Sequence, residues 1–112
     1  MRHIVEDDFS ISYTNLNNYP VIVIWVLSEP LYIDIIHARV FADINQVRRK
    51  PGAPEEFIPA ISLSSADIGS SDGFDDDPFS HNKKDVIGVY PTMKQAMRAI
   101  EKEIERQVSL YL

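Results

Sequence analysis

The 112-residue sequence contains no cysteine. Disulfide bonds, thiolate zinc sites and a cysteine nucleophile are therefore excluded, and the composition fits a reducing compartment. The first ten residues, MRHIVEDDFS, carry acidic residues where a signal peptide needs an apolar run. The longest apolar run, VIVIWVL at residues 21–27, is far shorter than the roughly 20 residues that span a membrane. We therefore expect a cytoplasmic protein that does not enter a membrane.

Basic residues are missing from the middle of the chain. Residues 54–82 contain seven acidic residues but neither lysine nor arginine, which gives this segment a charge of −7. Residues 1–53 carry a net charge of −1 and residues 83–112 carry +2, so the whole negative excess of −6 lies in the central segment. An acidic protein repels the phosphate backbone of nucleic acids. We therefore expect no direct nucleic-acid binding, and a protein partner with a basic surface.

Two segments in the first part of the chain have strand patterns. FSISYTN at residues 9–15 alternates between apolar and polar side chains, which predicts a half-buried strand. The turn-forming residues NLNNYP follow. The run at residues 21–27 is apolar at every position, which is typical of a strand in the middle of a sheet with both faces covered.

The pattern of residues 31–47 admits two interpretations. Ser28 and Pro30 could open a helix, but the sequence alternates from Ile36 onward, so we predict a strand. LYIDI at residues 31–35 alternates in the opposite phase, which indicates a β-bulge near Ile35. A loop at residues 48–56 then leads to a strand at residues 57–65. Pro59 within that strand favours an edge position or a late strand start.

The C-terminal segment predicts one amphipathic helix. Thr92 is a good N-cap, Gln95 completes a capping box, and apolar residues follow at helical spacing to about Leu110. Between the strands and this helix, residues 66–84 read as a flexible acidic loop and residues 85–90 as a short strand. The sequence therefore predicts a single α+β domain over residues 1–112. Its antiparallel sheet has four to five strands, and the C-terminal helix packs on one face.

A single helix leaves one face of the predicted sheet without cover. Exposed apolar patches of several hundred Å² are uncommon on monomers. The second face must then be covered by the long loop, by the helix of another copy, or by a sheet partner. We therefore predict a homo-oligomer that forms through the uncovered sheet face.

The segment DGFDDDPFSHN at residues 72–82 has the highest density of candidate metal-binding or catalytic side chains. Its carboxylates and its histidine are Asp72, Asp75, Asp76, Asp77 and His81. A calcium loop needs alternate oxygen ligands, a glycine at the turn and a distal glutamate, and this segment does not match that register. We therefore predict no metal site or cofactor, and interpret the four aspartates as a contact for a basic partner or as a solvated loop.

A second set of residues could bind an anionic ligand. His37 and Arg39, together with Asp43, fall on one face of the predicted strand, and Arg48, Arg49 and Lys50 lie at a loop tip. Trp25 or Tyr32 could stack on a base. The arginines could equally pair with Glu55 and Glu56 across the same loop, which would contribute about 0–1 kcal/mol.

Three classes of function remain after these exclusions. The favoured one is a small acidic interaction protein without enzymatic activity, such as an inhibitor, an immunity protein or a regulator of the kind found in phages and mobile elements. The alternative is an oligomeric module that binds a small ligand or a nucleotide. A metal-assisted hydrolase using Asp75–Asp77 with His81 ranks last because no group of residues has the spacing of a catalytic or metal-binding motif, and we assign no catalytic residue.

Overall fold

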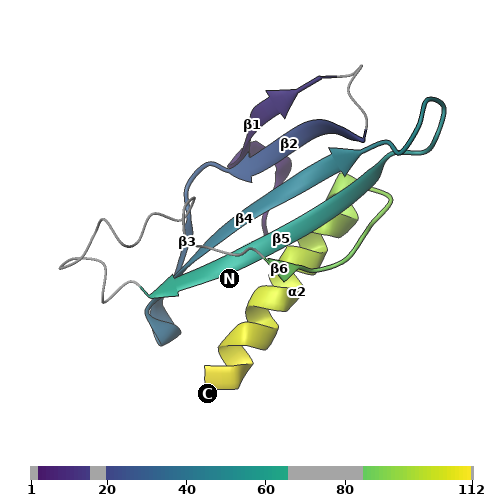
Figure 1. Ribbon diagram of the computed structural model, residues 1–112. Helices are drawn as coiled ribbons and strands as arrows, with labels where there is room; N and C mark the ends of the chain where they lie inside the picture. Colours follow the sequence, from purple (N-terminus) through teal and green to yellow (C-terminus); the bar gives the residue numbers. More distant parts are fainter. Residues whose placement is uncertain (1–2, 16–19, 66–84, 112) are drawn as a thin grey trace.

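The computed structural model describes residues 3–15, 20–65 and 85–111 of the chain. These residues form one antiparallel sheet of six strands with a single long helix packed against it (Figure 1). The strand order is β1-β2-β4-β5-β6, and β3 pairs with β4 beyond the stretch where β2 pairs with it. The predicted α+β architecture with one C-terminal helix is therefore confirmed.

The elements follow one another along the chain with short connections in most places. They are the short 3₁₀ helix η1 (Glu6–Asp8), the strands β1 (Phe9–Thr14), β2 (Val21–Leu27) and β3 (Leu31–Ile33), the 3₁₀ helix η2 (Asp34–Ile36), the strands β4 (Ala38–Val47), β5 (Glu56–Ser65) and β6 (Asp85–Val86), and the helix α2 (Met93–Tyr111).

The hydrophobic core lies between α2 and the face of the sheet that it covers. The alternation of β4 places Ala38, Val40, Ala42 and Ile44 in the interior, as the sequence predicts. The helix supplies the facing residues Ala96, Met97, Ile100 and Ile104, all of which are buried. Burying one large aliphatic side chain stabilises a fold by about 1.5–3 kcal/mol, so this interface is the main source of stability among the described residues.

Helix α2 begins where its cap predicts. The backbone N–H of Gln95 donates a hydrogen bond of 3.1 Å to the hydroxyl of Thr92, and the N–H of Ala96 donates to the Thr92 carbonyl over 3.1 Å. The first of these bonds satisfies a donor that has no backbone partner within the helix, and the second is the first i→i−4 bond of the helix. The helix extends to Tyr111, one residue beyond the predicted end.

Residues 31–47 differ from the sequence prediction of a single bulged strand. They form two strands, β3 and β4, which pair antiparallel, with Leu31 opposite Val40 and Ile33 opposite Ala38. The reversal is made by η2 and by His37, whose backbone is left-handed with φ 51° and ψ 49°. The change of phase in the sequence therefore marks a turn, and the prediction of a bulge near Ile35 is wrong.

The outer edge of β5 explains the position of Pro59. Strand β5 pairs with β4 along its whole length, whereas β6 pairs with it only at Ala60 and Ile61. The N–H of Ile87 donates to the Pro59 carbonyl over 2.9 Å, so the proline nitrogen also points toward this sparsely paired edge. Residues 85–90 therefore form less strand than predicted, namely two paired residues and a bridge between Phe57 and Tyr90.

The segment before β1 is fastened to α2 by a buried carboxylate. Glu101 is only 8% exposed, and it accepts a hydrogen bond of 2.5 Å from the backbone N–H of Ile4. Arg98 pairs with the same carboxylate and donates to the Ile4 carbonyl over 2.5 Å. His3 Nδ1 lies 3.1 Å from Glu101 Oε1. This arrangement, called the Glu101 clamp below, holds the buried side chain of Ile4 in the core.

The Glu101 clamp makes stability depend on pH. Burial raises the pKa of Glu101 and is the largest single influence, but the hydrogen bonds from Ile4, His3 and Arg98 together outweigh it and hold the pKa below its ordinary value. A lowered carboxyl pKa contributes stability above the unfolded-state pKa. That contribution is lost as the pH falls through the folded-state pKa.

We predict that Glu101→Gln lowers the free energy of unfolding at pH 7 by about 1–3 kcal/mol, because buried donors lose a charged acceptor. The variant should also lose part of the decline in stability that the wild type shows below about pH 4.5. Urea unfolding between pH 3 and pH 7 measures both effects. Glu105→Gln, at an exposed position of the same helix, is the control. Equal pH profiles for wild type and Glu101→Gln would contradict the prediction.

Candidate functional site

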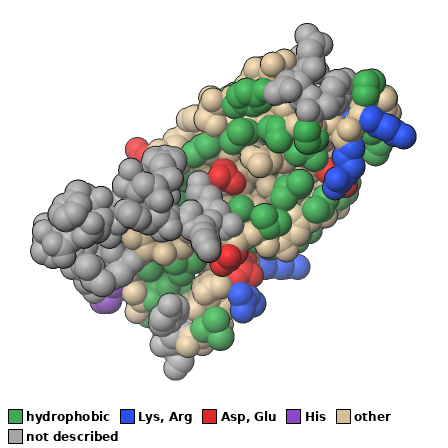
Figure 2. Space-filling model, viewed as in Figure 1, with side chains coloured by type: hydrophobic (Ala, Val, Ile, Leu, Met, Phe, Trp, Pro, Cys, Tyr) green, Lys and Arg blue, Asp and Glu red, His purple; other side chains and the backbone are tan. Residues whose placement is uncertain are grey.

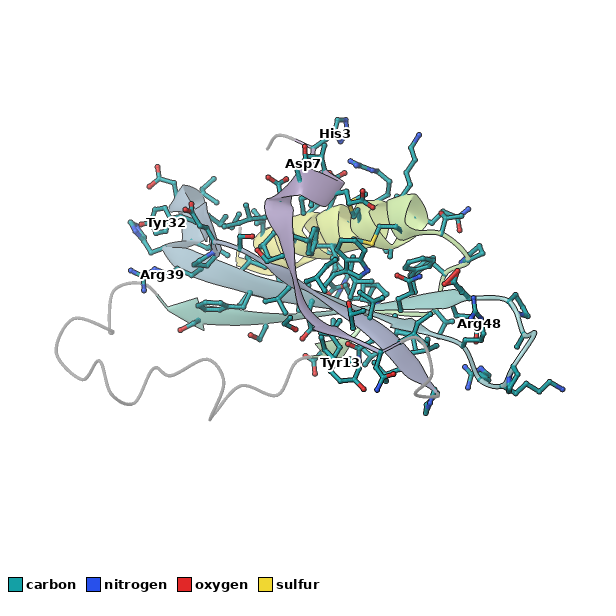
Figure 3. The ribbon with its side chains drawn as sticks, turned by 90° about the horizontal axis from the view of Figure 1, so that it is seen from above. His3, Asp7, Tyr13, Tyr32, Arg39 and Arg48 are labelled. Carbon is teal, nitrogen blue, oxygen red and sulfur yellow. The ribbon has the colours of Figure 1, made fainter. Side chains whose placement is uncertain are left out.

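The sheet has a second face that points away from α2, called the outer face below. Strand pairing brings together its residues in rows, with Val26, Asp43, Ala60 and Val86 in one row. The next row contains Tyr13, Ile24, Asn45 and Ile58. Figure 3 shows Tyr13 on the side of the sheet opposite the helix. These two rows are mainly apolar, whereas other outer-face positions of β4 and β5 carry Arg39, Ser62 and Ser64.

No described helix covers the outer face. Ile24, Val26, Phe41 and Ile58 are half-buried, while Val86 is 64% exposed. Figure 2 shows hydrophobic side chains spread across the strands, with lysine and arginine side chains near the β4–β5 hairpin loop and, beside acidic side chains, in the lower part of the view. The prediction that residues 21–27 lie inside the sheet is confirmed, because β2 pairs with β1 and β4.

The predicted partner-binding aspartates lie outside the described residues. Asp72, Asp75, Asp76 and Asp77, together with His81, fall within residues 66–84. The structure does describe where this segment is attached, because Ser65 ends β5 and Asp85 begins β6. Asp85 pairs with Ile61, so the two attachment points are four strand positions apart, or about 13 Å. Residues 66–84, called the acidic segment below, therefore connect two points on the same edge of the sheet.

One end of β4 brings together three residues with ligand-binding chemistry. Arg39 lies opposite Tyr32 in the β3–β4 pair, and both side chains are exposed. The Tyr32 hydroxyl lies 3.2 Å from Nδ1 of His37. His37 occupies the turn and not the strand, so the prediction that it shares a strand face with Arg39 and Asp43 is wrong for His37. The turn nevertheless places His37 beside Tyr32 and Arg39.

The basic loop tip lies at the opposite end of β4 (Figure 3). Strand β4 has ten residues, so about 30 Å separate His37 and Arg39 from Arg48–Lys50. Arg49 Nε lies 2.6 Å from Glu56 Oε1, and Arg48 Nη2 lies 3.5 Å from Glu55 Oε2. Both arginines therefore pair with glutamates of the same loop, as one of the two sequence interpretations expects. The residues of the candidate ligand site do not form one pocket.

Trp25 does not lie near Arg39. Its indole Nε1 donates a hydrogen bond of 3.1 Å to Gln46 Oε1, and its ring packs against the core on the α2 side of the sheet. Of the two aromatic residues considered for stacking, only Tyr32 is beside His37 and Arg39.

A polar groove that sequence reasoning missed lies between the β5–β6 edge and the C-terminal half of α2. Its volume is about 530 Å³, and its polar wall is formed by Glu103, Arg106 and Gln107. Arg106 Nη2 and Gln107 Nε2 donate to the Glu103 carboxylate over 2.6 and 2.8 Å. The hydrogen bond from Arg106 is the largest of the influences that hold the pKa of Glu103 below its ordinary value. Arg106 and Gln107 follow Glu103 by three and four residues, and this spacing on a helix could have indicated the cluster from the sequence.

The described residues contain no group of three or more histidine, aspartate or glutamate side chains that could hold a metal ion. Within the same residues, no helix is both long enough and apolar enough to cross a membrane. No protein-family model, curated protein or solved structure matches the chain.

Proposed function

We propose that this protein is a cytoplasmic interaction protein without enzymatic activity, which binds a basic surface of a partner protein through its acidic segment. Inhibitors, immunity proteins and regulators of the kind found in phages and mobile elements are the classes that fit. The supporting observation is the placement of charge. Five of the seven acidic residues of segment 54–82 lie within residues 66–82, which Lys83 and Lys84 follow, and residues 66–84 are joined to the sheet at Ser65 and Asp85.

The physical basis is electrostatic steering. A concentration of like charge on one part of a surface raises the rate of association with an oppositely charged partner and weakens at high salt.

We predict that the fourfold change Asp72→Asn, Asp75→Asn, Asp76→Asn and Asp77→Asn slows association with the partner by about tenfold at low salt and by less at high salt. The partner is first recovered by affinity purification from the native host with mass spectrometry, at both salt concentrations. Association rates with the recovered partner are then measured by surface plasmon resonance.

The control for this experiment removes four carboxylates elsewhere on the surface. Glu6→Gln, Asp7→Asn, Glu29→Gln and Asp34→Asn change the net charge equally, and all four positions are exposed. If both fourfold variants slow association by the same factor, the effect belongs to the net charge and the proposal for the acidic segment fails.

We further propose that the outer face joins two copies of this chain. We predict that the wild type sediments as more than a 12.8 kDa species at micromolar concentration. Val86→Lys, which places a charge at an exposed position of this face, should shift it toward the monomer. Ile35→Lys is the control, because Ile35 is similarly exposed but lies in η2. A wild type that is monomeric by analytical ultracentrifugation excludes this oligomer.

A second candidate function is the binding of an anionic ligand or nucleotide. It is favoured by the grouping of Tyr32, His37 and Arg39 at one end of β4. A thermal-shift screen with nucleotides should then find a ligand that stabilises the protein by about 2.7 kcal/mol at a hundred times its Kd. Arg39→Ala should abolish that stabilisation and Lys50→Ala should not. The absence of any stabilising nucleotide, or equal responses of the two variants, would count against a ligand site here.

A further inference from the structure

The N-terminal half of α2 carries a stripe of basic side chains. Lys94, Arg98 and Lys102 follow one another at intervals of four residues, which puts them on one side of the helix about 6 Å apart along its axis. Together with Tyr90, Gln95 and Ala99, they line an open groove with a volume of about 490 Å³. We call this site the basic groove.

The three cations of the basic groove differ in what they contact. Arg98 belongs to the Glu101 clamp, so its charge is balanced by a buried carboxylate. Lys94 and Lys102 are exposed, and neither forms an ion pair within the described residues. The groove therefore carries an unbalanced positive charge on a chain whose net charge is −6.

The position of Lys94 does not favour helix stability. It lies in the first turn of α2, where the positive end of the helix dipole destabilises a cation. The same dipole stabilises an anion bound at that end. An anionic group that contacts Lys94 would therefore offset the repulsion between Lys94 and the helix dipole, and it would itself be attracted by that dipole.

The apolar part of the groove is held in place by the sheet. Ala99 is buried, and the backbone of Tyr90 forms hydrogen bonds of 2.7 and 2.9 Å with Phe57. The Tyr90 hydroxyl approaches Gly88 so closely that a Cβ at that position would lie 3.0 Å from it. The Tyr90 side chain therefore packs over Gly88, which has no side chain, and it forms a wall of the groove.

We propose that the basic groove binds an extended acidic segment of a partner protein. Lys94 and Lys102 are eight helical residues apart, which corresponds to about 12 Å. Carboxylates four residues apart on one side of an extended chain are separated by about 13 Å, so both can reach a lysine. The Tyr90 and Ala99 surface accepts an apolar side chain between them. A nucleic acid fits less well, because its many phosphates meet the repulsion of a chain with net charge −6.

The basic groove is independent of the proposed function, because it binds an acidic ligand whereas the proposed function concerns a basic partner. The test uses a fluorescein-labelled nine-residue peptide of alternating glutamate and serine, and fluorescence anisotropy at low salt. We expect saturable binding by the wild type, and an affinity at least about fivefold lower for Lys94→Glu and for Lys102→Glu. Lys50→Glu makes the same charge change at the tip of the β4–β5 loop, outside the lining of the groove, and should alter the affinity by less than about twofold.

Several results would overturn the proposal. These are no saturable binding by the wild type, equal losses for Lys94→Glu and Lys50→Glu, or equal binding of a peptide with glutamine in place of glutamate. Tighter binding of a single-stranded oligonucleotide of equal length would show that the groove takes a nucleic acid. Self-association of the wild type that is lost in Lys94→Glu and Lys102→Glu would show that a second copy occupies it. Circular dichroism verifies that each variant is folded.

Discussion

The packing of α2 on one face of the sheet is the constraint on which the other features depend. The helix buries Ala96, Met97, Ile100 and Ile104 against the inward-facing residues of β4 and its neighbours, and this makes the principal core. Because the chain has no other helix among its described elements, the outer face keeps half-buried apolar side chains near the surface. The Glu101 clamp adds the N-terminal segment to the same interface, since it joins α2 to the backbone of Ile4. The principal core of the described residues therefore lies on one side of the sheet.

Charge is separated along this one-sided fold. The acidic segment is attached to β5 and β6, whereas α2 carries Lys94 and Lys102 on the flank of its N-terminal half. The remaining cluster of cations, at the β4–β5 loop, is largely balanced by Glu55 and Glu56. Exposed ion pairs of this kind contribute little to stability, but they remove charge that an anionic partner would otherwise contact. The unbalanced cations of α2 are therefore a better candidate for recognition than the more conspicuous run at residues 48–50.

Local patterns were sufficient to predict most elements, and the failures occur where distant residues meet. The alternation of β4 and the Thr92 cap depend on neighbouring residues, and both are confirmed. The turn at Asp34–His37 was missed because a histidine in left-handed conformation has no strong sequence signal. The Glu101 clamp joins residues 97 and 98 positions apart, so no spacing rule could find it. The polar groove at Glu103 and Arg106 showed its helical spacing, but only the fold places β5 and β6 beside it.

The length of β4 bears on the choice between a small ligand and a protein partner. A nucleotide-sized molecule cannot contact both Arg39 and Arg48, because about 30 Å of strand lies between them. At the Arg39 end, a small ligand would meet one arginine, one histidine and one tyrosine, whose side chains are exposed. Ligand sites usually bury most of the ligand surface, so these exposed side chains alone would make a weak site. The length of β4 therefore argues against a single small ligand that uses the basic residues at both of its ends.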